Sequence, residues 1–244
     1  MTDKLSRRTF TKAGVAATAL GATVLQTAKS HARVIGANDR IRCGFIGIAN
    51  RGGQLLKAFT ENEDMEVTAL CDANSTTLGK VADSYDGKPF TTGDFRKLID
   101  RDDLDAVVIA TPDHWHAIMM TMACNAKKDV YVEKPLSVTI HEGRKMVEAA
   151  RRNDRVVQVG THRRSSPLYT DLATRTADAI VGKVTVSRAY RLSNMWPNGI
   201  GKSQPSAPPA DLDWDMWLGP APWRPYNHQY VEGRWRGYWD FDSG

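Results

Sequence analysis

The chain has 244 residues, of which 41% are hydrophobic, and a formal net charge of +5. This composition is typical of a soluble globular protein with enough apolar content for a core, and it excludes a disordered or fibrous chain. Residues 1–32 hold five basic residues and one acidic residue, so they account for most of the positive charge. The remainder is nearly neutral and lacks the basic surface that a polyanion requires. We therefore predict no nucleic-acid partner.

The N-terminus has the pattern of a twin-arginine signal peptide. Arg7 and Arg8 stand in the sequence SRRTFTK, an apolar run covers residues 13–25, and Ser-His-Ala at 30–32 provides a cleavage site. The run is too short and too rich in Ala, Gly and Thr to span a bilayer comfortably, although a membrane anchor or a fortuitous basic end remains an alternative. We predict that residues 1–32 direct export to the periplasm, with the twin-arginine export machinery as partner.

Apolar runs and helical patterns alternate between residues 33 and 160, which predicts βαβ units and a parallel sheet. The expected strands cover residues 41–48, 65–71, 106–110, 130–132 and 156–159. The expected helices cover residues 52–61, 76–85, 94–100, 116–126 and 140–153, with Asp94 as a cap of the third. Residues 106–110 (AVVIA) show no polar alternation, so this strand is expected in the middle of the sheet.

The pattern changes after Gly160. A helix is expected over residues 167–180 and an alternating strand over 183–191, followed by a stretch rich in Pro, Trp and Gly. We predict an α/β protein with a Rossmann dinucleotide-binding domain at 33–160 and an incomplete α+β substrate domain at 161–244. The three cysteines show no metal-site spacing and are expected to be buried, inert thiols: Cys43, Cys71 and Cys124.

A glycine-containing turn joins the first strand to the first helix. Gly47, Ala49 and Gly52 give G-x-A-x-x-G, a variant of the pattern in which a tight turn brings pyrophosphate to a helix N-terminus. Ala49 replaces the glycine of closest phosphate approach, which weakens the signal, and glycines in such turns also serve packing alone. The candidate cofactor contacts in this turn also include Asn50 and Arg51.

Asp72 ends the second strand, 20 residues after Gly52. A carboxylate there can accept hydrogen bonds from the adenosine ribose and would repel a 2′-phosphate, so we predict NAD as the cofactor. Arg51 is long enough to reach a phosphate, which keeps NADP open. The alternative is that Asp72 only caps the following turn.

Two further motifs follow later strands, at the same edge of the sheet. Thr111 and Pro112, both candidate cofactor contacts, begin TPDHWH. In this motif Asp113 is a candidate helix cap, and either histidine alone more often fills a loop than performs chemistry. Glu133 and Lys134 begin EKP. A lysine at this edge can bind a substrate hydroxyl and stabilise the alkoxide that develops as hydride leaves, while the alternative is a surface ion pair.

The segments GFIGIANRG, CDAN, ATPDHWHA, YVEKPLS and VQVGTHRRS resemble the Gfo/Idh/MocA oxidoreductases from about residue 39 to the end. The resemblance implies that Lys134 lies beside nicotinamide and substrate, and that Glu133 contacts the cofactor. His116 matches the family's histidine after Thr-Pro, and the resemblance makes His116 and Gln158 candidate cofactor contacts. Gln158 and His162 lie where the last strand leads into the substrate domain, and many relatives have Gln at the position of His162.

This resemblance implies a hydride-transferring enzyme for a sugar, cyclitol or related polyol, homo-oligomeric when full length. Residues 213–225 (DWDMWLGPAPWRP) resemble the exported branch, whose tryptophans would build the substrate-domain wall or an ordinary aromatic core. The family continues after WDF with D-x-G-x-H-x-x-D, so we expect a truncated chain. Two alternatives stay open: a nucleotide-binding fragment without turnover, and an NAD-dependent glycosidase, whose relatives typically carry an EVP-type sequence in place of EKP.

Overall fold

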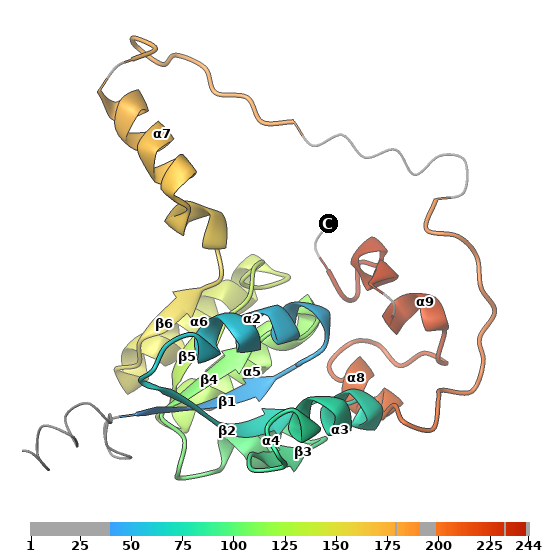
Figure 1. Ribbon diagram of the computed structural model, residues 1–244. Helices are drawn as coiled ribbons and strands as arrows, with labels where there is room; N and C mark the ends of the chain where they lie inside the picture. The colour runs from blue at the N-terminus through green and yellow to red at the C-terminus, as the bar shows by residue number, and fades with distance from the viewer. Residues whose placement is uncertain (1–39, 179, 191–198, 232, 243–244) are drawn as a thin grey trace, which may run out of the picture.

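The computed structural model describes residues 40–178, 180–190, 199–231 and 233–242, so the predicted signal peptide at 1–32 lies outside the described residues. Its centre is a six-stranded parallel sheet in the order β3-β2-β1-β4-β5-β6 (Figure 1). The strands are β1 Ile41–Ile46, β2 Met65–Cys71, β3 Phe90–Thr92, β4 Ala106–Ile109, β5 Asp129–Val132 and β6 Val157–Val159. This arrangement confirms the predicted Rossmann fold.

Helices cover both faces of the sheet because its strands are apolar on both sides. They are α2 Asn50–Thr60, α3 Ser75–Asp83, α4 Phe95–Ile99, α5 His116–Asn125 and α6 Ile140–Asn153. Val107 packs with α4, α5 and α6, while its neighbour Val108 packs with α2 and α3. The strand expected in the middle of the sheet is therefore central and buried on both faces.

Local sequence signals explain several helix ends. Asp94 caps α4 by accepting from the Arg96 N–H at 3.0 Å, as predicted. Thr139 and Glu142 form a capping box at the start of α6, whose predicted bounds are confirmed. The three cysteines are buried, as expected. Burial raises the pKa of the Cys43 thiol to about 12, which makes it a poor nucleophile.

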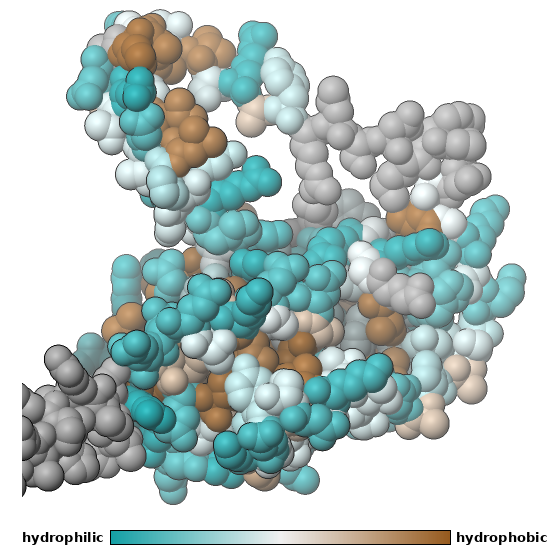
Figure 2. Space-filling model, viewed as in Figure 1, coloured by the Kyte–Doolittle hydropathy of each residue, from teal (hydrophilic) through white to brown (hydrophobic). Residues whose placement is uncertain are grey.

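Residues after Gly160 depart from the sequence prediction. The helix expected over 167–180 forms as α7, Pro167–Ala177, and none of its residues is buried. It extends away from the sheet, and its apolar side chains, including Leu168 and Leu172, lie at the surface (Figures 1 and 2). The strand predicted over 183–191 is wrong for residues 183–190, which are exposed and irregular. A strand needs a pairing partner, and the described residues offer none beside this segment.

The last described segment folds back onto the sheet. It contains α8 Trp214–Leu218, α9 His228–Val231 and a short turn of helix at Arg234–Gly237. Their aromatic side chains pack around Phe241 in a third core cluster. We call this the aromatic cluster; its buried members are Leu212, Trp214, Trp217, Leu218, Tyr226, Trp235 and Phe241. Within the described ranges, no helix has the length and apolarity needed to cross a bilayer.

Candidate functional site

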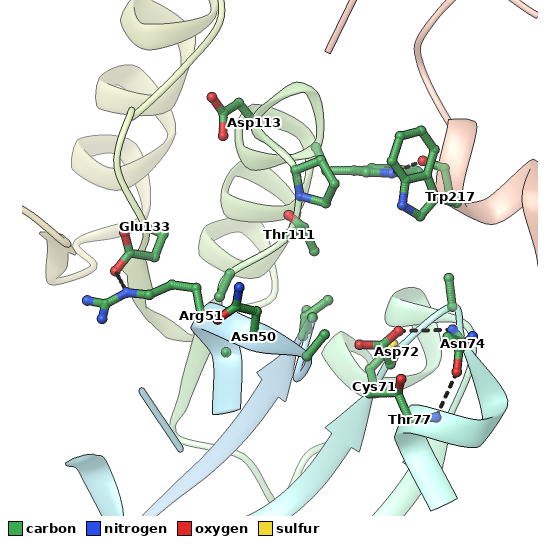
Figure 3. A pocket seen from close by; sticks show the side chains of 18 of the residues that line it. Asn50, Arg51, Cys71, Asp72, Asn74, Thr77, Thr111, Asp113, Glu133 and Trp217 are labelled. Atoms are coloured by element: carbon green, nitrogen blue, oxygen red, sulfur yellow. Dashed lines mark hydrogen bonds and ion pairs between the residues drawn. The ribbon is translucent and has the colours of Figure 1, made fainter. Parts of the chain in front are cut away.

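A cavity of about 720 Å³ lies at the carboxyl ends of the strands, between the sheet and the aromatic cluster (Figure 3). Ligands of open α/β sheets bind at this edge because the loops there diverge at the switch in strand order. Ten of the residues predicted as contacts line the cavity: Gly47, Ala49, Asn50, Arg51, Gly52, Asp72, Thr111, Pro112, Glu133 and Lys134. Four separate strand ends thus bring their candidate residues together.

The turn after β1 has the form that a dinucleotide requires. Gly47 has φ +76°, and a Cβ there would stand 3.0 Å from the main chain of Ala110 and Thr111. A Cβ on Gly52 would stand 1.7 Å from the Gly47 carbonyl oxygen. Ala49 precedes α2 and provides no side-chain cap, so N–H groups of the first turn remain available to a ligand. The turn therefore fits a pyrophosphate group.

Asp72 lies at the end of β2, where it lines the cavity and fixes two loops. One carboxylate oxygen accepts the Ile48 N–H at 2.9 Å, and the other accepts the Asn74 N–H at 2.9 Å. Burial raises the pKa of Asp72, although these N–H groups oppose the shift. Each oxygen has further lone-pair capacity, so the carboxylate can still accept hydrogen bonds from a ribose.

Glu133 and Arg51 form an ion pair at the opposite side. Arg51 Nε lies 2.7 Å from Glu133 Oε1, and the second oxygen of Glu133 accepts the Lys134 N–H at 3.0 Å. Figure 3 shows the Arg51 side chain directed toward Glu133 and away from Asp72. The Lys134 side chain is exposed, and its ammonium makes no hydrogen bond or ion pair with the described part of the chain.

His116 and Gln158 do not line the cavity. The His116 ring is fully buried, with its nitrogens 2.7 Å and 3.0 Å from the carbonyl oxygens of Pro135 and Thr111. It thereby ties the TPDHWH loop to the EKP loop. Gln158 is exposed and donates to the Val159 carbonyl at 2.8 Å. The cofactor contact that the resemblance implies for these two residues stays a prediction.

Asp113 is the first residue of a short 3-10 helix, Asp113–Trp115, and Pro112 is the N-cap of this helix. The prediction that Asp113 is a helix cap is therefore wrong. Its side chain is buried at the cavity, and one oxygen has no hydrogen-bond partner among the described residues. Burial and the neighbouring carboxyl of Asp242 raise its pKa to about 8. Burial also lowers the pKa of the adjacent His114 to about 4, so this imidazole is neutral.

The chain's last segment forms a wall of the cavity that the sequence predicted only in part. Leu212, Met216, Trp217, Trp235 and Arg236 all line the cavity. The Trp217 carbonyl accepts the Trp115 indole N–H at 3.0 Å, which joins α8 to the loop after β4. In the sequence, only the tryptophans of residues 213–225 indicated this wall. They were expected in a substrate-domain wall or an aromatic core, and Trp217 belongs to both.

Two models of one family match separate stretches of the chain. The model described as an oxidoreductase family with an NAD-binding Rossmann fold matches residues 41–161, and its C-terminal alpha/beta domain matches 178–244. The chain belongs to the Gfo/Idh/MocA oxidoreductase family. The family's dinucleotide-binding fold agrees with the glycine turn and Asp72 described above.

Relatives of the chain carry different names. A glycosyl hydrolase family 109 protein from Shewanella putrefaciens is 32% identical over 174 residues, covering 62% of this chain and 38% of the relative. An NAD-binding oxidoreductase from Klebsiella pneumoniae is 27% identical with a TM-score of 0.53, covering 59% of this chain and 40% of that structure. The fold also matches myo-inositol 2-dehydrogenase from Lactobacillus plantarum, at 24% identity and a TM-score of 0.56, covering 59% and 43%. The chain spans less than half the length of each of these proteins.

Proposed function

We propose that the complete protein transfers a hydride between a nicotinamide dinucleotide, preferably NAD, and a sugar, cyclitol or related polyol. The observation that carries this proposal is the ammonium of Lys134, which has no hydrogen bond or ion pair to the described residues and belongs to the lining of the same cavity as the glycine turn and Asp72. A bound nicotinamide supplies the hydride acceptor, and the family fold supports such a cofactor.

The surrounding residues hold Lys134 in place for this role. Glu133 accepts the Lys134 main-chain N–H, and Arg51 holds Glu133 through the ion pair that links α2 to the end of β5. The ammonium is then free to donate to a substrate hydroxyl and to stabilise the developing alkoxide. A neutral side chain at position 134 would leave that charge without a partner, so the chemical step would slow.

The test is a comparison of Lys134→Met with the wild type, using NADH formation from a panel of polyols and calorimetric titration with NAD. We expect Lys134→Met to bind NAD but to lose roughly 100-fold or more in kcat, the size of loss typical of removing an electrostatic stabiliser. Lys57→Met removes an equal charge from an exposed position on α2 and should change neither quantity. Unchanged kcat in Lys134→Met would refute the proposed role.

A glycosidase that uses a nicotinamide only transiently is the second candidate. The observation in its favour is the 32% identity to a glycosyl hydrolase family 109 protein. The intact Glu133-Lys134-Pro135 sequence favours net redox chemistry instead, because the family resemblance implies an EVP-type sequence there in a glycosidase. Incubation with a chromogenic glycoside separates the two: release of free sugar without accumulation of NADH supports the glycosidase.

We also propose export through the twin-arginine route, on the evidence of the Arg7-Arg8 pattern in residues 1–32. Cell fractionation tests this directly. The wild type should be found in the periplasm, and a variant with both arginines replaced by lysine should stay in the cytoplasm. A periplasmic double variant would exclude this route.

A further inference from the structure

Asp211, a residue outside the predicted site, lies against the loop that follows Asp72. The Asn74 side-chain amide donates to the Asp211 carboxylate at 3.1 Å, and the Ser75 N–H donates to the Asp211 carbonyl oxygen at 2.7 Å. The next residues continue the contact, because the Asp213 N–H donates to the Ala73 carbonyl at 2.9 Å. The segment beginning at Asp211 is therefore bonded along residues 73–75.

NAD and NADP differ at the 2′-position of the adenosine ribose, and this loop would face that position in a bound dinucleotide. A ribose held by Asp72 directs its 2′-oxygen toward the residues that follow the second strand, and a 2′-phosphate there needs positive charge or free N–H groups. The first turn of α3 would otherwise offer such groups. Asp211 takes the Ser75 N–H, and the Asn74 side chain takes the Thr77 N–H at 2.7 Å.

The charges around the loop also disfavour a 2′-phosphate. Asp72 and Asp211 are both carboxylates, and hydrogen bonds from Thr76 and Asn74 lower the pKa of Asp211, so it is ionised at neutral pH. Arg51, which the sequence left open as a phosphate ligand, is paired with Glu133 on the other side of the cavity. The Lys80 ammonium also helps to lower the pKa of Asp211.

We propose that Asp211 makes the chain selective for NAD over NADP by placing a second carboxylate, from the substrate domain, beside the 2′-position of the ribose. Selectivity then depends on both parts of the chain, because Asp211 reaches the loop only when its segment is docked. Leu212 and Asn74, its neighbours, line the cavity itself. The inference rests on the proposed nicotinamide cofactor and adds a residue that sets which one is accepted.

The experiment is calorimetric titration of the 244-residue chain with NAD and with NADP, in the wild type and in Asp211→Asn. The amide can keep the contact with Asn74 but has no charge. We expect the ratio of NADP affinity to NAD affinity to rise about tenfold, the effect of removing one nearby charge at intermediate dielectric. Asp211→Glu keeps the charge and should leave the ratio near that of the wild type.

Asp215→Asn is the matched control, because Asp215 lies on the exposed side of α8 and carries the same charge. An equal rise in this control, or an unchanged ratio in Asp211→Asn, would overturn the role of Asp211. If Asp211 had a purely structural role, Asp211→Asn would weaken the binding of NAD and NADP equally, and the ratio of the two affinities would stay unchanged. If the wild type binds neither dinucleotide, the proposal of a nicotinamide cofactor is wrong as well. If the wild type binds NAD but the ratio does not change in Asp211→Asn, only the inference about Asp211 is wrong.

Discussion

The parts of the chain before and after Gly160 reach stability in different ways. The earlier part closes its own core, because helices cover the central strands of the sheet on both faces. The later part has a helix with no buried residue and an exposed stretch at 183–190. Among its described residues, a core forms only where the aromatic cluster packs on loops at the sheet's edge. The second part therefore depends on the first for its fold, while the cavity depends on both.

Trp217→Ala should produce the largest change. Trp217 stacks on Trp214 with ring centroids 5.1 Å apart, meets Phe241 edge-on at 5.0 Å, and is only 9% exposed. Replacing a buried tryptophan by alanine destabilises its surroundings by about 3–5 kcal/mol. Hydrogen exchange should show faster exchange in α8 and α9, with protection retained in β1 and β4.

The control for that substitution is Trp223→Ala, because Trp223 is 76% exposed. It should change stability by less than about 0.5 kcal/mol. Equal loss of protection in the sheet and in the aromatic cluster would contradict the comparison, since it would mean that the two parts unfold as one unit.

Gly52→Ala should act mainly on the first part of the chain. The new Cβ would collide with the Gly47 carbonyl oxygen, so the turn must shift at a cost of about 1–3 kcal/mol. We expect loss of NAD binding in calorimetry together with a lower unfolding midpoint. Gly53→Ala is the matched neighbour, with its nearest contact at 3.5 Å, and should bind NAD normally. Normal binding by Gly52→Ala would show that the turn does not hold the cofactor.

The sequence predicted the first part far better than the second, for physical reasons. Continuous apolar runs predict buried parallel strands, so five of six strands were found, whereas β3, with the sequence FTT, has one apolar residue and no apolar run. The strand expected at 183–191 had the right alternation but depends on a pairing partner, which alternation cannot reveal.

The sequence also predicted the site residues of the first part better than those of the second. Gly47, Gly52 and Asp72 line the cavity because they lie at the end of a strand or in the first turn of the helix that follows, and sequence spacing conveys these positions. The contact between Asp211 and Asn74 joins residues 137 apart, and no periodic pattern reports such a contact. Arg51 and Glu133 were each predicted as a cofactor contact, but their pairing with one another became visible only in the fold.

The smallest expected effect concerns Asp113, which lies between the two parts. Its carboxyl has a pKa of about 8 in the fold, against 3.8 as its ordinary value, so the folded state keeps a proton that the unfolded state loses. Stability should therefore fall as pH rises from about 4 to about 8. His114 acts in the opposite direction below pH 6.5, because its lowered pKa makes the unfolded state bind more protons there. Between pH 6.5 and 8, His114 no longer opposes the fall in stability that the Asp113 carboxyl causes.

In this window the free energy of unfolding should fall by at most about 1.4 kcal/mol per pH unit, the limit for one proton. Denaturant unfolding at several pH values measures it. Asp113→Asn should flatten the slope, while Asp86→Asn, at an exposed position, should keep it. Because Asp242 of the second part helps to raise the pKa of Asp113, Trp217→Ala should flatten the slope too. A slope that survives in Trp217→Ala would show that burial within the first part alone holds the proton, and that docking of the second part contributes nothing to it.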